Sequence, residues 1–300
     1  MQTGTIINNR YRIVRILGQG GFGAVYRAWD INLNQARALK INLETSLEAQ
    51  RQFQREASTL ASLSHPSLPR VTDYFFVEGL GQFLIMDYVD GEDLETILAS
   101  EGQFAPEQAL SITIQVANAL AYLHQQNPPI IHRDIKPANI RITPDGKVFL
   151  VDFGLVKIYD QTLRTTIGAR AVTPGYSPPE QYGQGATDTR TDVYALAATL
   201  YTMLTGQEPQ ESVQRIVEDK LRPLTQLNSA VSRPMSVALL QAMSLNPSQR
   251  YQSVDEFMYW LQQPESAINT KTPSAVVTKP PPGVVRSQCG GWWVRPFCFR

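Results

Sequence analysis

Short apolar runs separated by turn residues dominate the first part of the chain. The segments YRIVRIL, AVYRAWD and ARALKI are rich in β-branched and aromatic residues and are separated by GQGGFG and NLNQ. This pattern predicts three antiparallel strands. Two more β-rich runs, VTDYFFV and QFLIMDYV, flank the turn EGLG and predict further strands. Between these two groups a helical spacing predicts a helix over 47–63, with its apolar positions at Phe53, Ala57 and Leu60.

Helical patterns take over from Pro106 onward. Pro106 suits the first turn of a helix, and the apolar stripe that follows ends near His124. This stripe consists of Ile112, Val116, Leu120 and Leu123. The segment 192–206 is apolar nearly all round and closes on Gly206, which predicts a buried central helix. The segment VDEFMYWLQQ predicts a last helix before Pro264.

The change from strands to helices predicts an α+β chain of two lobes. We expect a small lobe with an antiparallel β-sheet and one helix over 11–86, a hinge over 87–91, and a larger, mainly α-helical lobe over 92–263. Residues 1–10 are expected to form an N-terminal extension. Residues 264–300 are rich in Pro, Thr, Ser and Val, and we expect a flexible tail.

Composition narrows the class of protein. A chain of 300 residues with 43% hydrophobic and 18% charged residues is globular, and its net charge of zero argues against nucleic-acid binding. Both cysteines, Cys289 and Cys298, lie in the tail. The part of the chain before the tail, residues 1–263, therefore has no disulfide framework or cysteine metal site. We expect a cytoplasmic location. Neither a signal peptide nor a transmembrane helix is expected.

The predicted tail has a chemistry of its own. Its five basic residues face one acidic residue, a local charge of +4. One interpretation is a tag that docks on a membrane surface or a partner through the aromatic side chains Trp292, Trp293, Phe297 and Phe299. The other interpretation, which we favour, is an end of the chain without a dedicated function.

The segment LGQGGFGAV places Gly18, Gly20 and Gly23 in the spacing G-x-G-x-x-G-x-V. Glycines allow backbone amides to approach phosphate oxygens closely. The same spacing occurs in dinucleotide-binding folds, but there the loop opens a helix, whereas the β-prone AVYRAW follows here. The sequence contains no Gly-Lys-Ser/Thr phosphate loop. A loop that covers a nucleotide and an ordinary glycine hairpin remain as the two interpretations.

Four other side chains could act with that loop. Lys40 ends the third predicted strand and could bind phosphates, with Glu56 on the following helix as its partner. Asp152 lies in the apolar run VFLVDFGL, where a carboxylate is costly unless it is paired or binds a cation. Asn139 offers an oxygen ligand for the same cation. Taken singly, each also fits a plain structural role, such as a surface lysine or a turn aspartate.

The densest polar cluster, HRDIKPAN at 132–139, lies between apolar residues and indicates a loop held at a site. With the other motifs it resembles the signature set of eukaryotic-type Ser/Thr protein kinases, in the same order and spacing. These other motifs are Gly18/Gly20/Gly23, Lys40, Glu56, DFG at 152–154 and SPPE at 177–180. TPGYSPPEQY resembles the bacterial, cyanobacterial-like branch. The resemblance covers about residues 11–263 and implies the bilobal protein-kinase fold.

The resemblance implies a site for ATP, for Mg²⁺ or Mn²⁺, and for proteins with Ser or Thr as substrates. The glycine loop would cover ATP, while Lys40, paired with Glu56, would hold its phosphates. Asp134 would accept the proton of the substrate hydroxyl or orient it, and Lys136 would steady the γ-phosphate. The implied metal ligands are Asn139 and Asp152.

The resemblance also implies an adenine pocket, in which the backbone of the hinge bonds the edge of the base. Its expected residues are Leu17, Val25, Ala38, Met86, Asp87, Val89 and Arg141. Arg141 departs from the family pattern, because an apolar residue usually forms the floor under adenine there. Either its methylene stem packs beneath the base with the guanidinium turned to solvent, or its charge weakens ATP binding.

Further matches imply structural or regulatory roles. Glu180 and Arg250 would form an ion pair, and Asp192 would hold the backbone of the catalytic loop, HRDIKPAN at 132–139. We expect structural roles for the three histidines His65, His124 and His132, and no partner is visible for the first two. Kinases with an arginine before the catalytic aspartate, here Arg133, are often activated by a phosphate between 155 and 177. The expected sites are Thr165 and Thr166, with an unmodified loop as the alternative.

We therefore predict a serine/threonine protein kinase that autophosphorylates in this segment. Thr173 and Lys136 resemble the Ser/Thr-specific subset of the family. The alternatives are a pseudokinase scaffold and a small-molecule phosphotransferase. The positions that pseudokinases usually lose are all present: Lys40, Asp134, Asn139 and Asp152. The glycine loop, Lys136 and SPPE argue against the small-molecule enzyme.

Overall fold

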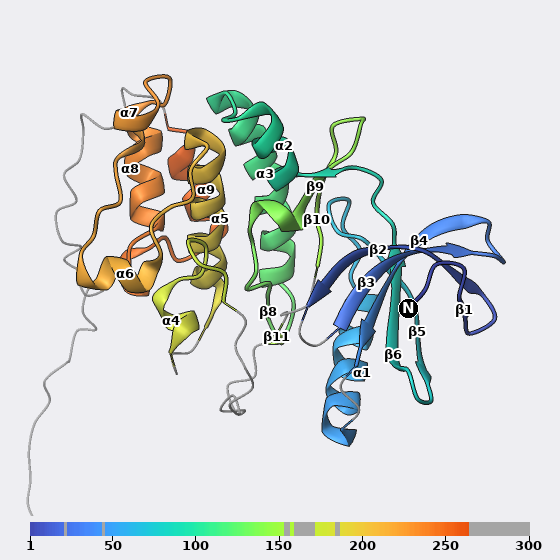
Figure 1. The fold of residues 1–300 in the computed structure, drawn as a ribbon. Helices are drawn as coiled ribbons and strands as arrows, with labels where there is room; N and C mark the ends of the chain where they lie inside the picture. The colour runs from blue at the N-terminus through green and yellow to red at the C-terminus, as the bar shows by residue number, and fades with distance from the viewer. Residues whose placement is uncertain (21–22, 44–45, 153–156, 159–171, 184–186, 264–300) are drawn as a thin grey trace, which may run out of the picture.

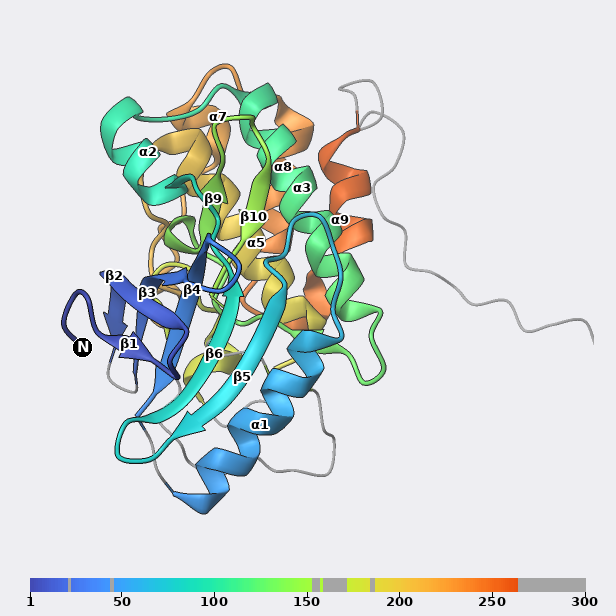
Figure 2. The same cartoon turned by 90° about the vertical axis from the view of Figure 1, so that its right-hand side faces the viewer.

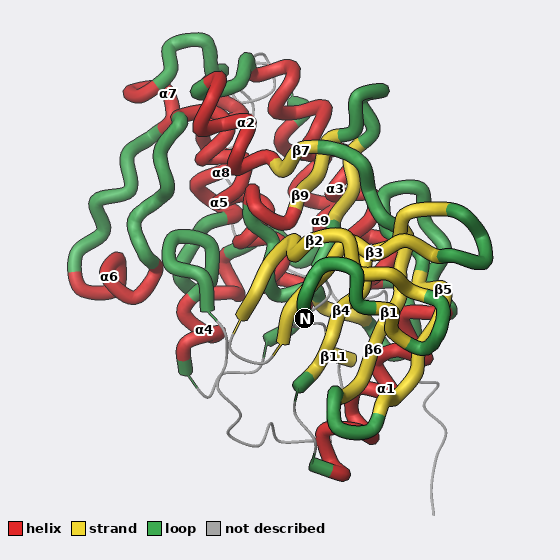
Figure 3. Tube along the Cα trace, turned by 45° about the vertical axis from the view of Figure 1, so that its right-hand side comes forward, coloured by secondary structure: helices red, strands yellow, loops and turns green. Residues whose placement is uncertain are grey.

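Two lobes lie side by side in the computed structural model, a curled sheet with one helix and a larger body of helices (Figure 1). The structure describes residues 1–20, 23–43, 46–152, 157–158, 172–183 and 187–263. The predicted α+β, bilobal architecture is confirmed. Figure 3 shows the long strands gathered in one lobe, while most helices lie in the other.

The small lobe contains an antiparallel sheet with the strand order β1-β2-β3-β4-β6-β5. Its elements are β1 (Ile6–Ile7), β2 (Tyr11–Gly20), β3 (Gly23–Asp30), β4 (Gln35–Asn42), β5 (Val71–Val77), β6 (Gly81–Asp87) and the helix α1 (Leu47–Ala61). The five strands predicted from the apolar runs are confirmed, and the helix predicted over 47–63 ends two residues earlier. Strand β1 carries no sequence signal of its own, because two residues are too few to show a period.

Alternation along β4 gives the sheet two different faces. Leu39 and Ile41 are buried in an apolar cluster on one face. Ala38 and Lys40 lie on the other face, because side chains two residues apart on a strand point the same way. Helix α1 runs along the sheet and packs against β5 and β6 (Figure 2). The ring of Phe53 on α1 lies 5.8 Å from that of Tyr74 on β5.

The first ten residues are fastened to the small lobe. Ile6 and Ile7 pair with β2, and the amino group of Met1 donates to the hydroxyl of Tyr26 at 2.9 Å. Arg10 donates to both carboxylate oxygens of the fully buried Asp30 at 3.0 and 2.8 Å. These bonds lower the pKa of Asp30 below its ordinary value. The predicted extension thus adds an edge strand to the sheet.

The large lobe is built around one buried helix. Its helices are α2 (Leu94–Glu101), α3 (Pro106–His124), α4 (Pro179–Tyr182), α5 (Thr189–Thr205), α6 (Ser212–Val217), α7 (Leu224–Leu227), α8 (Arg233–Ala242) and α9 (Val254–Leu261). Every residue of α5 from Thr191 to Thr205 is buried, and α3, α8 and α9 pack around it. Gly206 ends α5 in the left-handed region at φ +66°. The predictions for α3 and for the central helix are confirmed.

Short strands and a 3₁₀ turn lie where the two lobes meet. They are β7 (Glu92–Asp93), β8 (Ile130–Ile131), β9 (Ile140–Ile142), β10 (Val148–Leu150), β11 (Lys157–Ile158) and η1 (Pro137–Asn139). A further 3₁₀ turn, η2 (Pro247–Gln249), lies between α8 and α9 in the large lobe. Strand β9 pairs with both β10 and β7. Among the described residues, no helix is both long and apolar enough to cross a membrane.

The predicted ion pair of the large lobe is confirmed. Arg250 donates to the two carboxylate oxygens of Glu180 at 2.6 and 2.9 Å, and also to the backbone oxygen of Ser244 at 2.7 Å. The side chain of Arg250 has no exposed surface, and that of Glu180 is 10% exposed. A carboxylate buried to this degree is costly without its partner.

Replacing Arg250 with methionine should therefore destabilise the chain. We expect Arg250→Met to lower the free energy of unfolding by about 3–5 kcal/mol in urea titrations, because Glu180 loses its partner. The double variant Glu180→Gln/Arg250→Met should recover part of this loss. The control is Lys220→Met, which removes an exposed pair with Glu218 and should cost less than about 1 kcal/mol. Equal losses in the two single variants would contradict the prediction.

Candidate active site

The sheet places five of the predicted site residues in two adjacent cross-strand rows. In one row Gly18 lies opposite Val25, which in turn lies opposite Lys40. In the next row Ala38 lies opposite Met86. Ala38 and Met86 belong to the apolar cluster that continues into the large lobe. The site face of the small lobe is therefore the face that meets the helices.

The glycine segment spans the end of β2 and the start of β3, which pair with each other up to Gly20 and Gly23. A Cβ atom at Gly23 would overlap the carbonyl oxygen of Ile41, so only glycine fits at this point of the sheet. At Gly18 a Cβ atom would meet nothing within 4 Å. Gly20 pairs with Gly23, and Leu17 lies at an irregularity of the β2–β3 pairing. A close approach of this backbone to phosphate stays a prediction at Gly18 and Gly20.

Lys40 and Asp152 meet between the lobes. The ammonium nitrogen of Lys40 lies 2.6 Å from Oδ1 of Asp152. The backbone of Asp152 is left-handed, with φ +62°, a conformation that costs a non-glycine residue about 1–3 kcal/mol. Strained backbone of this kind is concentrated at functional sites. Glu56 lies half-buried on α1, and its predicted pairing with Lys40 stays a prediction.

The buried carboxylate of Asp192, on α5, holds the polar cluster at 132–139. Its oxygens accept hydrogen bonds from the backbone amides of His132 at 2.9 Å and Arg133 at 2.8 Å. The backbone of Arg133 is left-handed, with φ +70°. This confirms the predicted role of Asp192. Burial alone would raise the pKa of Asp192, but hydrogen bonds from His124 and the amide of Arg133 lower that pKa below its ordinary value.

Asp134 lies at the centre of a network of polar side chains. Its Oδ1 accepts a hydrogen bond from the hydroxyl of Thr173 at 2.8 Å, and the ammonium of Lys136 lies 3.0 Å from its Oδ2. Lys136 also donates to the hydroxyl oxygen of Thr173 at 3.1 Å. Asn139 donates to Oδ2 and to the backbone oxygen of Asp134 at 2.9 and 2.7 Å. The sequence-distant Thr173 is thus brought to the predicted catalytic residues.

Thr173 is itself fixed by its neighbours. Its amide donates to the hydroxyl of Ser177 at 2.9 Å, and its carbonyl oxygen accepts from the amide of Ser177 at 2.9 Å. The carbonyl oxygen of Ser177 accepts from the buried hydroxyl of Ser212 on α6 at 2.7 Å. This segment presents an aliphatic hydroxyl to Asp134 on a rigid backbone.

The site thus combines a carboxylate that binds an aliphatic hydroxyl with a lysine and an amide side chain, on a bilobal fold. A comparison with known families agrees with this arrangement. Residues 11–265 match the family described as "Protein kinase domain". The chain belongs to this family. The predicted resemblance is confirmed.

Individual relatives of this kinase chain are bacterial. It is 36% identical over 270 residues to the serine/threonine-protein kinase PknB of Mycobacterium leprae, a match that covers 85% of this chain and 43% of the relative. It is 33% identical over 282 residues to a probable serine/threonine-protein kinase, CPE1738, of Clostridium perfringens, and this match covers 90% of this chain and 41% of the relative. The kinase chain therefore spans less than half the length of these relatives.

Solved structures agree with the fold. The kinase domain of Mycobacterium tuberculosis PknI matches with a TM-score of 0.67 at 29% identity, and the match covers 87% of this chain and 98% of that domain. Membership of the family implies the use of ATP, a divalent metal and protein substrates. Asn139 and Asp152 fit a metal of this kind, because amide and carboxylate oxygens suit hard cations. The described residues contain no cluster of three or more His, Cys, Asp or Glu side chains that could hold a metal ion.

Arg141 of the kinase does not turn to solvent, which corrects one of the two expectations for this residue. Its Nη1 donates to the carbonyl oxygen of Gly91 at 2.7 Å and lies 3.5 Å from that of Val89. The side chain is 22% exposed. A hydrogen bond from a charged donor such as the guanidinium to a backbone carbonyl is stronger than one between neutral groups, which favours this direction of the side chain.

Two residues of the site were missed by sequence reasoning. His124 was expected to have no partner, but its Nε2 lies 2.8 Å from Oδ2 of Asp192. Gln181, on α4, donates to the carbonyl oxygen of Arg133 at 2.8 Å. A polar residue at the end of an apolar helical stripe was the available signal for His124. His65 stacks on Tyr122, and burial lowers the pKa of His132, in agreement with structural roles.

Some predictions fall outside the described residues. They concern Phe153 and Gly154 of the DFG motif, the proposed phosphorylation sites Thr165 and Thr166, and the tail at 264–300. The side chain of Arg133, which was expected to bind a phosphate, contacts the hydroxyl of Thr187. Its regulatory role, the role of the tail and the cytoplasmic location stay predictions.

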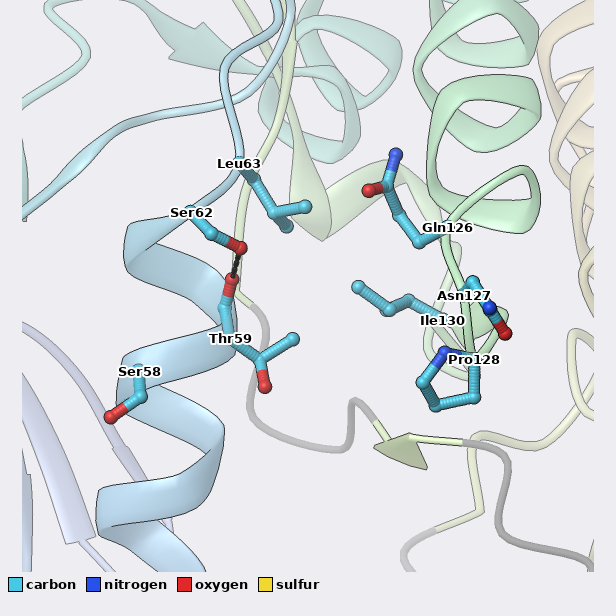
Figure 4. A pocket seen from close by; sticks show the side chains of 8 residues that line it. All are labelled: Ser58, Thr59, Ser62, Leu63, Gln126, Asn127, Pro128 and Ile130. Carbon is cyan, nitrogen blue, oxygen red and sulfur yellow. Dashed lines mark hydrogen bonds between the residues drawn. The ribbon is translucent and has the colours of Figure 1, made fainter.

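A pocket of about 340 Å³ opens between the end of α1 and the segment that joins α3 to β8 (Figure 4). It is lined by Ser58, Thr59, Ser62, Leu63, Gln126, Asn127, Pro128 and Ile130. The hydroxyls of Ser58 and Ser62 donate to backbone oxygens of α1. None of these residues belongs to the predicted site, and we assign the pocket no ligand.

The anchoring of the catalytic loop predicts a pH dependence of stability. The pKa of Asp192 lies below its ordinary value of 3.8. The contribution of this carboxylate to the free energy of unfolding is therefore complete above that pH and is lost as pH falls through the folded-state pKa. We expect Asp192→Asn to lower the unfolding free energy by about 2–4 kcal/mol at pH 7. The difference between the two proteins should shrink below about pH 4.

Urea unfolding at several pH values from 3 to 7 tests this expectation. Glu78→Gln is the matched control, because Glu78 is exposed in the β5–β6 turn. A difference between wild type and Asp192→Asn that stays constant over the whole range would contradict it.

Proposed function

We propose that this chain is an ATP-dependent serine/threonine protein kinase, which transfers the γ-phosphate of ATP to Ser or Thr hydroxyls of proteins. The observation that carries the proposal is the 2.8 Å hydrogen bond from the hydroxyl of Thr173 to Asp134. The carboxylate thus already receives an aliphatic hydroxyl of the kind that a substrate would present. The relatives named serine/threonine-protein kinases support the same conclusion.

Asp134 and the side chains around it have different roles in the proposed phosphoryl transfer. Asp134 orients the substrate hydroxyl and accepts its proton, within hydrogen-bond reach as general-base chemistry requires. Asn139 fixes the carboxylate through its amide nitrogen. Lys136, 3.0 Å from Asp134, places a positive charge where the transferred group gains negative charge.

Two groups of residues would hold the nucleotide and its metal. Bound ATP supplies the phosphoryl group, and a divalent ion neutralises its charge. We propose Mg²⁺ as this ion, with Mn²⁺ as a substitute, held by Asn139 and Asp152. Lys40, now 2.6 Å from Asp152, lies close enough to bind the phosphates beside that metal.

A pseudokinase scaffold is the alternative, and it predicts nucleotide binding without transfer. Incubation with Mg-ATP and casein, followed by phosphoamino-acid analysis, separates the two functions. We expect phosphoserine or phosphothreonine with the wild type, and a loss of about 100- to 10,000-fold with Asp134→Asn, which keeps ADP affinity. Asp145→Asn, in an exposed turn, is the control. Transfer at equal rates by wild type and Asp134→Asn would refute the role of Asp134.

Autophosphorylation is a second part of the proposal. The threonines between 155 and 177, above all Thr165 and Thr166, are the expected acceptors, and Arg133 is the expected partner of the phosphate. Mass spectrometry of the chain after incubation with Mg-ATP should find a phosphate in this segment. The inactive Asp134→Asn variant should show none. A wild-type segment without phosphate would contradict this part and leave the transfer activity standing.

A further inference from the structure

The hinge of this kinase is held at its downstream end by a side chain from the large lobe. Arg141 lies on β9, directly opposite Asp93 of β7. Its Nη1 donates to the carbonyl oxygen of Gly91 at 2.7 Å and lies 3.5 Å from that of Val89. Its Nη2 lies 3.8 Å from Oδ2 of Asp93. The bond to Gly91 is thus the strong one, and the other two contacts are at the limit of direct bonding.

The acceptors of this guanidinium are themselves fixed. A Cβ atom at Gly91 would overlap the carbonyl oxygen of Ile142, so the hinge exit lies directly against β9. The other oxygen of Asp93 caps α2, since Oδ1 accepts from the amide and hydroxyl of Thr96 at 2.9 and 2.8 Å. Arg141 therefore lies between three backbone elements and contacts each of them: the hinge, β9 and the start of α2.

The upstream end of the hinge is held by arginines of the small lobe. The carboxylate of Asp87 pairs with Arg37 on β4 and with Arg70 at 3.1 Å. The guanidinium of Arg27 lies over the ring of Tyr88, 4.9 Å from its centre. A segment held at both ends by guanidinium groups pays little ordering entropy when a ligand bonds to its backbone.

We propose that Arg141 is a positioning residue for the nucleotide base. It holds the hinge through the carbonyl group of Gly91, so that the backbone before it meets the edge of the base in a preset geometry. Arginine in place of an apolar floor is then an aid to binding and not a handicap. The inference rests on the proposed function only for the identity of the ligand as an adenine nucleotide.

ADP affinity measured by titration calorimetry tests this role without any transfer step. We expect Arg141→Leu to bind ADP roughly five- to tenfold more weakly than the wild type, because the carbonyl of Gly91 loses a charge-assisted bond. Arg141→Lys keeps a charged donor but not the forked geometry and should lie between the two. Arg12→Leu, at an exposed position of β2, should leave the affinity unchanged.

A second ligand separates positioning of the base from a general loss of fold. Magnesium tripolyphosphate has no base, so its affinity should be the same in wild type and Arg141→Leu. Tighter or unchanged ADP binding by Arg141→Leu would overturn the inference, as would an equal loss for both ligands. A wild type that binds ADP but transfers no phosphate would refute the proposed kinase activity and leave this inference standing. A wild type that does not bind ADP would refute both.

Discussion

The carboxylate of Asp192 has no exposed surface, and the arrangement of the catalytic loop depends on it. Burial of a charge is costly, and here two backbone amides and His124 offset that cost. The two amides belong to consecutive residues, the second of which is left-handed. One carboxylate on the most buried helix therefore stabilises a strained turn directly before Asp134.

From this turn the polar network extends in both directions along the chain. Asn139 closes the loop by bonding back to Asp134, and β9 follows immediately. On the other side, Gln181 bonds the carbonyl of Arg133 and Thr173 reaches Asp134. The side chains that would act on a substrate are therefore fixed by bonds to segments that the sequence places 37 to 60 residues away. Rigid placement of this kind is what phosphoryl transfer requires of a protein.

The sequence allowed most of the fold and most of the site to be predicted, for different reasons. Long strands and helices such as α3 carry a period that can be read directly, and the motif set located Asp134, Asn139 and Asp152. Strands of two or three residues, such as β7 and β9, have no period, because their partners create them. His124 and Gln181 were missed because their partners lie 68 and 48 residues away. The direction of Arg141 depended on carbonyl groups that no pattern reveals.

Arginine side chains donate hydrogen bonds to backbone carbonyl oxygens outside regular structure at three places in this kinase. Segments outside regular structure leave carbonyl oxygens without amide partners, and burial makes such groups costly. Arg141 donates to Gly91, Arg215 to Met243 and Arg250 to Ser244. Arg215 and Arg250 also hold a carboxylate with the rest of the fork, which a lysine cannot do in the same geometry. Arg141 differs in that Asp93 stands 3.8 Å away, so its bond to the hinge carries most of the interaction. The departure from the family pattern at this position therefore follows the same rule as the buried arginines of the large lobe.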